Sequence, residues 1–381
     1  MRRRQIISFM PKLGAAAMVS AFSNHVYAQD NSIVIGCSAP LTGPLASAGI
    51  SIKETTDLVM SQINARGGVN GRKLKFQMMD DAYVPSRSVE NVKAMLADSS
   101  IVALQTCVGT PNNAATLGMI EAAGIASLAP LTGASSLRKS NVKNLFHIRA
   151  SYTEEAERLV QRLVEMGLKD IAVLYLDNPY GTEFLGDVNR VLQTSKLKSV
   201  AEIPVAVDGK NVNEAVIKAL ASKPSVVLLG TAGAASGSLI SALKKMSSGL
   251  PIASISVVLT PQVAKALGAA GSGMALTSVL PNVNSGKMPI VREYQAAMRE
   301  GGITEFSGTG LEAYMNMRVM MAALERVGRG ELTRAKLRTA IATLPKIDLG
   351  GFSVDFPQGS PFVGSHFVEL GVLGSNGKML V

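Results

Sequence analysis

The feature that most constrains the fold is a regular alternation of short apolar runs with longer stretches of helical period. The runs SIVIGCSAP, KLKFQMMDD and SIVALQT have the length of strands. Between the first two, Ile52, Thr55, Val59 and Ile63 recur every three or four positions. Continuous apolar runs indicate strands buried on both faces, and their alternation with helices is typical of a parallel sheet. The sequence therefore predicts an α/β fold with a doubly wound parallel sheet.

The alternation restarts in the second half of the chain. Ser151 and Glu154 have the spacing of a capping box before the helical stretch EEAERLVQRLVEMG. Strand and helix patterns then alternate up to LPIASIS, helices dominate from residue 281, and the tail has short strands with glycine turns. A chain of 381 residues is long for one core. We therefore expect two lobes, with a boundary around Arg149 to Ser151.

The N-terminus has the order of a secretory signal. MRRR is a basic region, LGAAAMVSAF is a short apolar stretch, and VYA before Gln29 is a small-residue cleavage site. We expect residues 1–28 to be a signal peptide and the mature protein to be soluble and periplasmic. Arg3 to Ile7 also loosely fit a twin-arginine signal, so the export route stays open.

Charge and composition exclude several classes of function. The signal segment carries four basic residues and no acid, so the formal net charge falls from +10 to 10 − 4 = +6. The remaining basic residues are scattered among acids, which argues against a nucleic-acid partner. Cys37 and Cys107 each lie near a strand end, so buried thiols and a disulfide are both open. Because His147 and His366 are the only later histidines, we expect no metal site, no cofactor and no His-based triad.

Motifs for catalysis are weak. LGTAGAASG follows a strand but lacks the glycine spacing of a dinucleotide loop and the lysine of a phosphate loop. Asp80 and Asp81 end a strand, where paired carboxylates can act as acid and base or can simply hold a turn. The turn is the preferred interpretation. The sequence does not predict an enzyme.

A better candidate for a binding site is CVGTPNNAATLGM. It follows the strand SIVALQT, with Thr110 expected to be the N-cap of a helix and Pro111 to be its first residue. The amino end of a helix at the carboxyl end of a strand is a place where anions bind.

Beyond these local signals, the block from Ile33 to Glu90 resembles the opening of the leucine/isoleucine/valine-type periplasmic solute-binding proteins of ABC transporters. The shared features are Thr-Gly-Pro-Leu, Ile-Asn-Ala-x-Gly-Gly-x-x-Gly, and Asp-Asp followed by proline. GTPNNAA, APLTGASSLR, YLDNPYG and MALTSVLPNV add further similarity, which extends over residues 30–381. The resemblance implies a type I periplasmic binding fold with a three-crossing hinge. Lobe I would hold 29–149 and 281–345, and lobe II 150–280 and 346–381.

The resemblance also implies ligand-binding positions. In amino-acid-binding relatives, the position matching Thr110 offers a hydroxyl and a backbone N–H to the ligand carboxylate. The loop matching Leu131, Thr132 and Gly133 offers backbone groups, and the aromatic position matching Tyr180 closes over the ligand. Ser256 stands where relatives carry an acid for the α-ammonium group.

The expected function is therefore an exported, monomeric binding protein that delivers a small carboxylate-bearing solute to an inner-membrane ABC permease. The solute would be an amino acid or a related organic acid or amide. Since Ser256 is uncharged and a first-lobe aromatic position is taken by Ala48, we expect a carboxylate without an ammonium group to bind better than leucine, isoleucine or valine. Asp177 is the residue that would restore an acid. The alternatives are a periplasmic sensor for a signalling receptor and an exported two-lobed enzyme using Asp80, Asp81 or Asp177.

Overall fold

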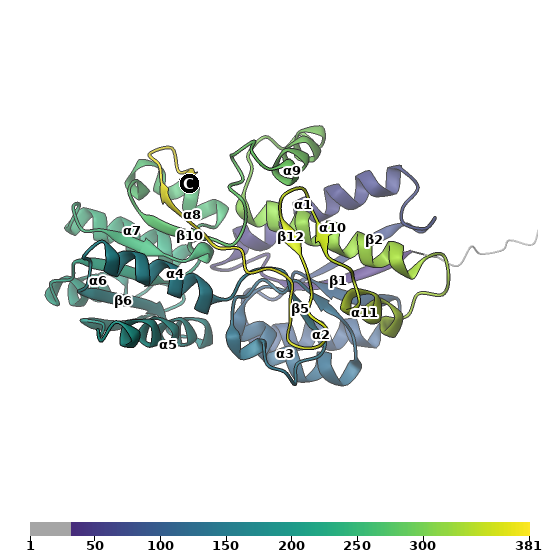
Figure 1. The fold of residues 1–381 in the computed structure, drawn as a ribbon, viewed down its shortest axis with the longest axis horizontal. Helices are drawn as coiled ribbons and strands as arrows, with labels where there is room; N and C mark the ends of the chain where they lie inside the picture. The colour runs from purple at the N-terminus through teal and green to yellow at the C-terminus, as the bar shows by residue number, and fades with distance from the viewer. Residues whose placement is uncertain (1–31) are drawn as a thin grey trace, which may run out of the picture. The chain divides into compact units, whose positions relative to one another are not determined.

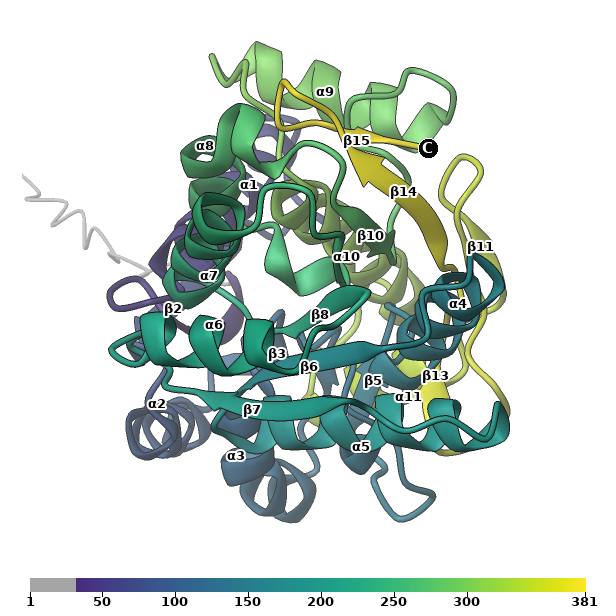
Figure 2. The same cartoon turned by 90° about the vertical axis from the view of Figure 1, so that its left-hand side faces the viewer.

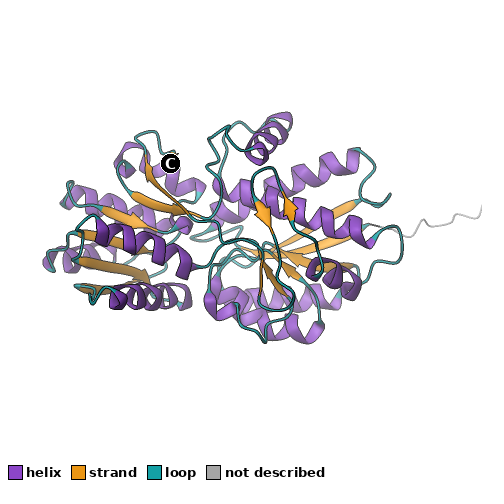
Figure 3. Cartoon of the chain, in the orientation of Figure 1, coloured by secondary structure: helices purple, strands orange, loops and turns teal. Residues whose placement is uncertain are grey.

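A computed structural model describes residues 32–381, so the predicted signal peptide lies outside the described residues. Within this range the helices and strands alternate as the sequence predicts (Figure 3). Among the helices of residues 32–381, none is both long and apolar enough to cross a bilayer.

The first half of the alternation builds a six-stranded sheet in the order β13-β5-β4-β3-β1-β2, with every neighbouring pair parallel. Its strands are β1 (Ile33–Ala39), β2 (Leu74–Asp80), β3 (Ile101–Gln105), β4 (Ser127–Leu128), β5 (Leu145–His147) and β13 (Phe362–Val363). The elements associated with it are α1 (Ala46–Ala65), α2 (Pro85–Ala97), α3 (Thr110–Ala123), η1 (Ser135–Leu137), α9 (Pro289–Glu300), α10 (Gly308–Val327), α11 (Arg334–Ala342) and the ribbon of β11 (Ile347–Asp348) and β12 (Ser353–Val354).

Both faces of this sheet are covered. On β3, Ile101 and Leu104 pack into one apolar cluster with Met95 of α2 and Ile120 of α3. Val102 points the other way, into a cluster that contains residues of α1 and α10. Figure 1 shows α2 and α3 on one side of the sheet and α1 and α10 on the other. Two-sided burial explains why the strands are continuously apolar in sequence.

The second sheet has seven strands in the order β15-β14-β10-β9-β8-β6-β7. Its strands are β6 (Ile171–Leu176), β7 (Ala201–Val205), β8 (Val226–Gly230), β9 (Ile252–Ser254), β10 (Ala275–Ser278), β14 (Glu369–Leu373) and β15 (Met379–Leu380). Its helices are α4 (Tyr152–Glu165), α5 (Pro179–Thr194), α6 (Val212–Ala221), α7 (Ala234–Met246), η2 (Ser256–Val258), α8 (Pro261–Leu267) and η3 (Gly268–Gly271). Strands β6 to β10 pair in parallel, and β14 and β15 add an antiparallel edge (Figure 2).

The chain passes between the two sheets three times. It leaves the first sheet after β5, returns after β10, and crosses again between β13 and β14. The first crossing ends at Ser151, which caps α4 and forms both bonds of the predicted capping box with Glu154. The predicted fold, with two doubly wound sheets joined by three crossings, is confirmed.

The tail differs from the predicted lobe boundaries. The resemblance predicts residues 346–381 in the second lobe, but β13 pairs in parallel with β5 of the first sheet. The stretch up to Val363 therefore belongs with the first sheet, and the part that joins the second sheet is β14 and β15. The physical reason is that β13 completes the exposed edge of β5 before the last crossing.

The two cysteines are free thiols close to each other, Cys37 on β1 and Cys107 just after β3. Cys37 is buried at the end of β1, and its Sγ donates to the Thr106 carbonyl at 3.5 Å. The Ser38 N–H in turn donates to Cys107 Sγ at 3.5 Å. Of the two possibilities that the sequence left open, the structure has buried thiols.

Candidate functional site

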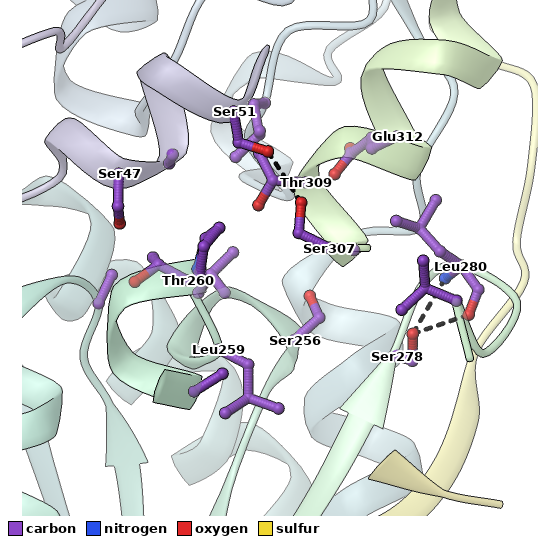
Figure 4. Close-up of a pocket in the computed structure, with 18 of the residues that line it drawn as sticks. Ser47, Ser51, Ser256, Leu259, Thr260, Ser278, Leu280, Ser307, Thr309 and Glu312 are labelled. Atoms are coloured by element: carbon purple, nitrogen blue, oxygen red, sulfur yellow. Dashed lines mark hydrogen bonds between the residues drawn. The ribbon is translucent and has the colours of Figure 1, made fainter. Parts of the chain in front are cut away.

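A cavity of about 830 Å³ lies where the carboxyl ends of strands from both sheets meet. Tyr83 follows β2 and Thr110 follows β3 in the first sheet, while Tyr180 follows β6 and Ser256 follows β9 in the second. In open parallel sheets, ligands bind at these carboxyl ends, next to the point where the strand order reverses. Helices α1 and α10 complete the lining, and Figure 4 shows Ser51 and Ser307 hydrogen-bonded to each other across them.

The Thr110 end of the cavity differs in detail from the prediction. Helix α3 begins at Thr110 itself, and the N-cap is Gly109, which has a φ of 97°. Glycine suits this position because φ is positive and a Cβ would lie 2.5 Å from the Tyr83 ring. The Thr110 hydroxyl does not cap the helix; it pairs with the Thr132 hydroxyl at 2.7 Å. The prediction that Thr110 is the N-cap is therefore wrong by one residue.

The loop that follows β4 contributes less backbone than the resemblance implies. Leu131 lines the cavity, but its N–H donates to the Cys107 carbonyl at 2.9 Å. The Thr132 N–H donates to the Pro130 carbonyl at 2.8 Å. Thr132 and Gly133 lie behind the cavity wall, where the Gly133 carbonyl accepts from the Tyr152 N–H at 2.8 Å. The structure thus brings Thr110, Leu131, Tyr180 and Ser256 together in the lining, with Thr132 and Gly133 directly behind them.

Three tyrosines form the aromatic wall of the cavity. The rings of Tyr152 and Tyr180 meet edge to face with centroids 5.1 Å apart. Burial raises the pKa of Tyr180 and of Tyr83 above the ordinary value, so both phenols stay neutral in the physiological range. The buried Tyr180 hydroxyl has no hydrogen-bond partner within the described part of the chain. Ala48 also lines the cavity, and Tyr83 and Tyr152 supply aromatic surface that the sequence prediction did not assign.

Ser256 is the centre of a buried charged network. Its N–H and hydroxyl donate to the two oxygens of Glu155 at 2.8 and 3.0 Å. Its hydroxyl also accepts from Nη2 of Arg149 at 2.7 Å. The Thr277 hydroxyl donates a further bond to Glu155 at 2.6 Å. Arg149 lies on the first crossing, so this network joins the crossing to α4, η2 and β10.

Glu312 adds a second buried carboxylate. It lies in the second turn of α10, is 6% exposed and lines the cavity, and its Oε1 is 3.6 Å from Nη1 of Arg149. Burial raises the pKa of Glu312, Arg149 opposes this shift, and Glu155 adds to it. The carboxylate accepts no hydrogen bond from any other described residue. Figure 4 shows Glu312 and Thr309 on the turns of α10 that face the cavity.

Sequence reasoning missed Glu312 and Arg149. A signal for the first was present, because Glu312 is the one charged residue between Gly310 and Met317, with apolar residues on both sides of it in the sequence. The lining therefore contains a buried acid at a position other than Ser256 or Asp177, and the preference between solutes stays a prediction. Asp177, the predicted alternative acid for an ammonium group, is not among the residues that line the cavity.

Asp80 and Asp81 hold a turn. Asp80 accepts from the N–H groups of Leu41, Thr42 and Ala82 at 2.7 to 3.1 Å, and from the Thr42 hydroxyl. Burial acts to raise the pKa of Asp80, but these hydrogen bonds together outweigh it and lower the pKa below its ordinary value. Asp81 accepts from two serine hydroxyls and the Tyr83 N–H. Among residues 32–381, no three His, Cys, Asp or Glu side chains are grouped so that they could hold a metal ion.

Comparison with known proteins agrees with this geometry. A model of the periplasmic binding protein family matches residues 32–363, and the chain belongs to that family. It is 23% identical to the Leu/Ile/Val-binding protein homolog 3 of Brucella melitensis over 352 residues, which are 89% of this chain and 93% of that protein. The resemblance found in the sequence is confirmed.

Solved structures show the same fold. A substrate-binding periplasmic protein from Ralstonia solanacearum superimposes with a TM-score of 0.86 at 30% identity, covering 92% of this chain and 99% of that one. A branched-chain amino acid ABC transporter protein from Thermus thermophilus with bound valine gives 0.81 at 16% identity, with coverage of 92% and 94%. The matching family and the curated relative are binding proteins, which confirms the prediction that the chain is not an enzyme. Membership of the family implies a periplasmic location.

Proposed function

We propose that this protein is the solute-binding component of an ABC importer and captures a small carboxylate-bearing solute in the cavity between its two sheets. The solute is an amino acid or a related organic acid or amide. The protein acts as an exported monomer, released by cleavage of residues 1–28, and delivers the solute to an inner-membrane permease.

The observation that carries this proposal is the cavity itself. Its lining comes from the carboxyl ends of both sheets and includes buried polar groups that face one space, notably Thr110 and Arg149. A solute seated there contacts both lobes at once, so binding can favour one arrangement of the lobes.

The proposed contacts divide between the lobes. Thr110 and Leu131, supported from behind by Thr132 and Gly133, form the end of the cavity that takes the solute carboxylate, and Tyr180 and Ser256 act from the second lobe. The names of the relatives support an amino acid or a similar acid, since one is a Leu/Ile/Val-binding homologue and another holds valine.

The test is a solute screen on protein freed of any bound solute by unfolding and refolding. Thermal denaturation is followed with leucine, isoleucine, valine, phenylalanine, benzoate, phenylacetate and short amides. A solute present at 100 times its Kd should stabilise the fold by about 2.7 kcal/mol. Small-angle X-ray scattering with the best solute should show compaction, and mass spectrometry should show the solute unchanged. If no solute in the screen raises the midpoint, the proposal fails.

A further inference from the structure

The buried charges at the cavity wall do not balance. Arg149 contributes one positive charge, and Glu155 and Glu312 contribute two negative charges when ionised. All three side chains are at most 8% exposed. The other charged residues of the lining, Glu54, Lys265, Glu305 and Lys378, are exposed to solvent and lie at the rim. A buried charge without a partner is strongly unfavourable, so the surplus carboxylate either takes up a proton or is balanced by a cation.

Hydrogen bonds decide which carboxylate carries the surplus. Glu155 accepts three bonds, from the Ser256 N–H, the Ser256 hydroxyl and the Thr277 hydroxyl. It also lies in the first turn of α4, where the helix dipole favours negative charge. Glu155 is thus stabilised without a ligand. Glu312 has neither advantage among the described residues. Its ion-pair partner is Arg149 at 3.6 Å, beyond hydrogen-bond length.

Arg149 donates its short hydrogen bond to Ser256 and not to Glu312. Its Nη2 donates to Ser256 at 2.7 Å, and Ser256 is fixed by Glu155. Its Nε is buried without a hydrogen-bond partner within residues 32–381. The guanidinium is therefore fixed through Nη2 and not through Nε. Arg149 therefore offsets the charge of Glu312 only in part.

Resting on the proposed function, we infer that Glu312 binds a cationic group of the solute and makes the cavity select ammonium-bearing solutes over otherwise identical acids. The acid that the sequence does not offer at Ser256 is supplied from α10, on the other lobe. With the solute carboxylate near Thr110, the cavity accepts a solute that carries both charges. A carboxylate without an ammonium group adds a second negative charge to a site that already has a surplus.

Matched pairs of probes that differ by one ammonium group test the inference. The pairs are leucine and 4-methylpentanoate, phenylalanine and 3-phenylpropanoate, and 4-aminobutanoate and butanoate. Calorimetry measures each Kd for the wild-type protein, for Glu312→Gln and for the control Glu54→Gln. The first substitution keeps the shape of the side chain and removes its charge, whereas Glu54 is an exposed acid of the same cavity. Thermal denaturation without solute checks that both variants fold.

In the wild-type protein, at least one ammonium-bearing probe should bind roughly 10- to 100-fold more tightly than its partner. Glu312→Gln should remove most of this difference, and Glu54→Gln should keep it. Equal or tighter binding of the plain acids, or a difference that survives in Glu312→Gln, overturns the inference. Binding of benzoate or another cation-free solute, with no binding of any ammonium-bearing probe, also overturns it but leaves the proposed function standing. If neither the screened solutes nor the matched probes bind, both the inference about Glu312 and the proposed function are refuted.

Discussion

Replacing Ser256 by alanine should destabilise the protein far more than its size suggests. The hydroxyl accepts from Arg149 at 2.7 Å and donates to Glu155 at 3.0 Å, and both charged side chains are buried, at 3% and 0% exposure. Hydrogen bonds to charged groups contribute about 1.5 to 3 kcal/mol each. Two such bonds set an upper limit of about 6 kcal/mol.

The expected loss is smaller than that limit because part of the network survives. Glu155 keeps the bonds from the residue 256 N–H and from Thr277. Arg149 can move toward Glu155, whose nearest oxygen is 3.9 Å away. We expect the free energy of unfolding to fall by about 3 kcal/mol, with the cost lying mainly in the donors that Arg149 leaves unpaired.

Urea denaturation followed by circular dichroism measures this loss, with Ser278→Ala as the matched control. Ser278 also lines the cavity, but its hydroxyl bonds only to the backbone of Leu280, at 2.7 and 3.3 Å. Its loss should cost about 1 kcal/mol. If Ser256→Ala costs no more than Ser278→Ala, the hydroxyl does not hold the two charges in place and the description of the network is wrong.

Three further substitutions test other parts of the structure. Thr110→Ala should weaken binding of the solute found in the screen by about 1 to 3 kcal/mol in calorimetry; unchanged affinity would place the site elsewhere. Gly133→Ala should lower the denaturation midpoint, with a loss of about 1 to 3 kcal/mol, because a Cβ would lie 2.4 Å from the Tyr152 ring; an unchanged midpoint would contradict that packing. Burial keeps the pKa of His147 well below 6.5, so the folded protein leaves it neutral while the unfolded chain takes up a proton as the pH falls. Stability should therefore drop by about 2 kcal/mol between about pH 7 and pH 5 on account of this residue, and His147→Gln should flatten that part of the profile; equal slopes would refute it.

The architecture was predictable because it depends on patterns that stand in the sequence. Strands buried on both faces are continuously apolar, and the helices between them repeat every three or four residues. The capping box of Ser151 and Glu154 needs only residues three positions apart, and both of its bonds are present. Information of this kind is local, so it survives in a sequence taken alone.

The errors occur where a distant contact decides the local structure. The N-cap of α3 is Gly109, which lies against the ring of Tyr83 from the preceding strand loop, and the Thr110 hydroxyl bonds instead to Thr132 at 2.7 Å. Strand β13 has two residues, which is too few to predict from the sequence which sheet it joins. It pairs with β5 because the edge of β5 at Phe146 is otherwise open. In both cases the partner is visible only after the chain has folded.

The charge of the cavity also depends on contacts between distant parts of the chain, so it could not be predicted from single positions. Comparing one position with its counterpart in relatives leads to a neutral Ser256 and hence to the expectation of a missing acid. In the fold that serine is bonded to Glu155 and Arg149, and Glu312 faces the same cavity from α10. An acid that pairs with an ammonium group must lie at a given place in the cavity, and α10 can supply it as well as the segment at Ser256. The ligand preference therefore has to be argued from the summed charge of the buried network, and that sum favours a solute with an ammonium group.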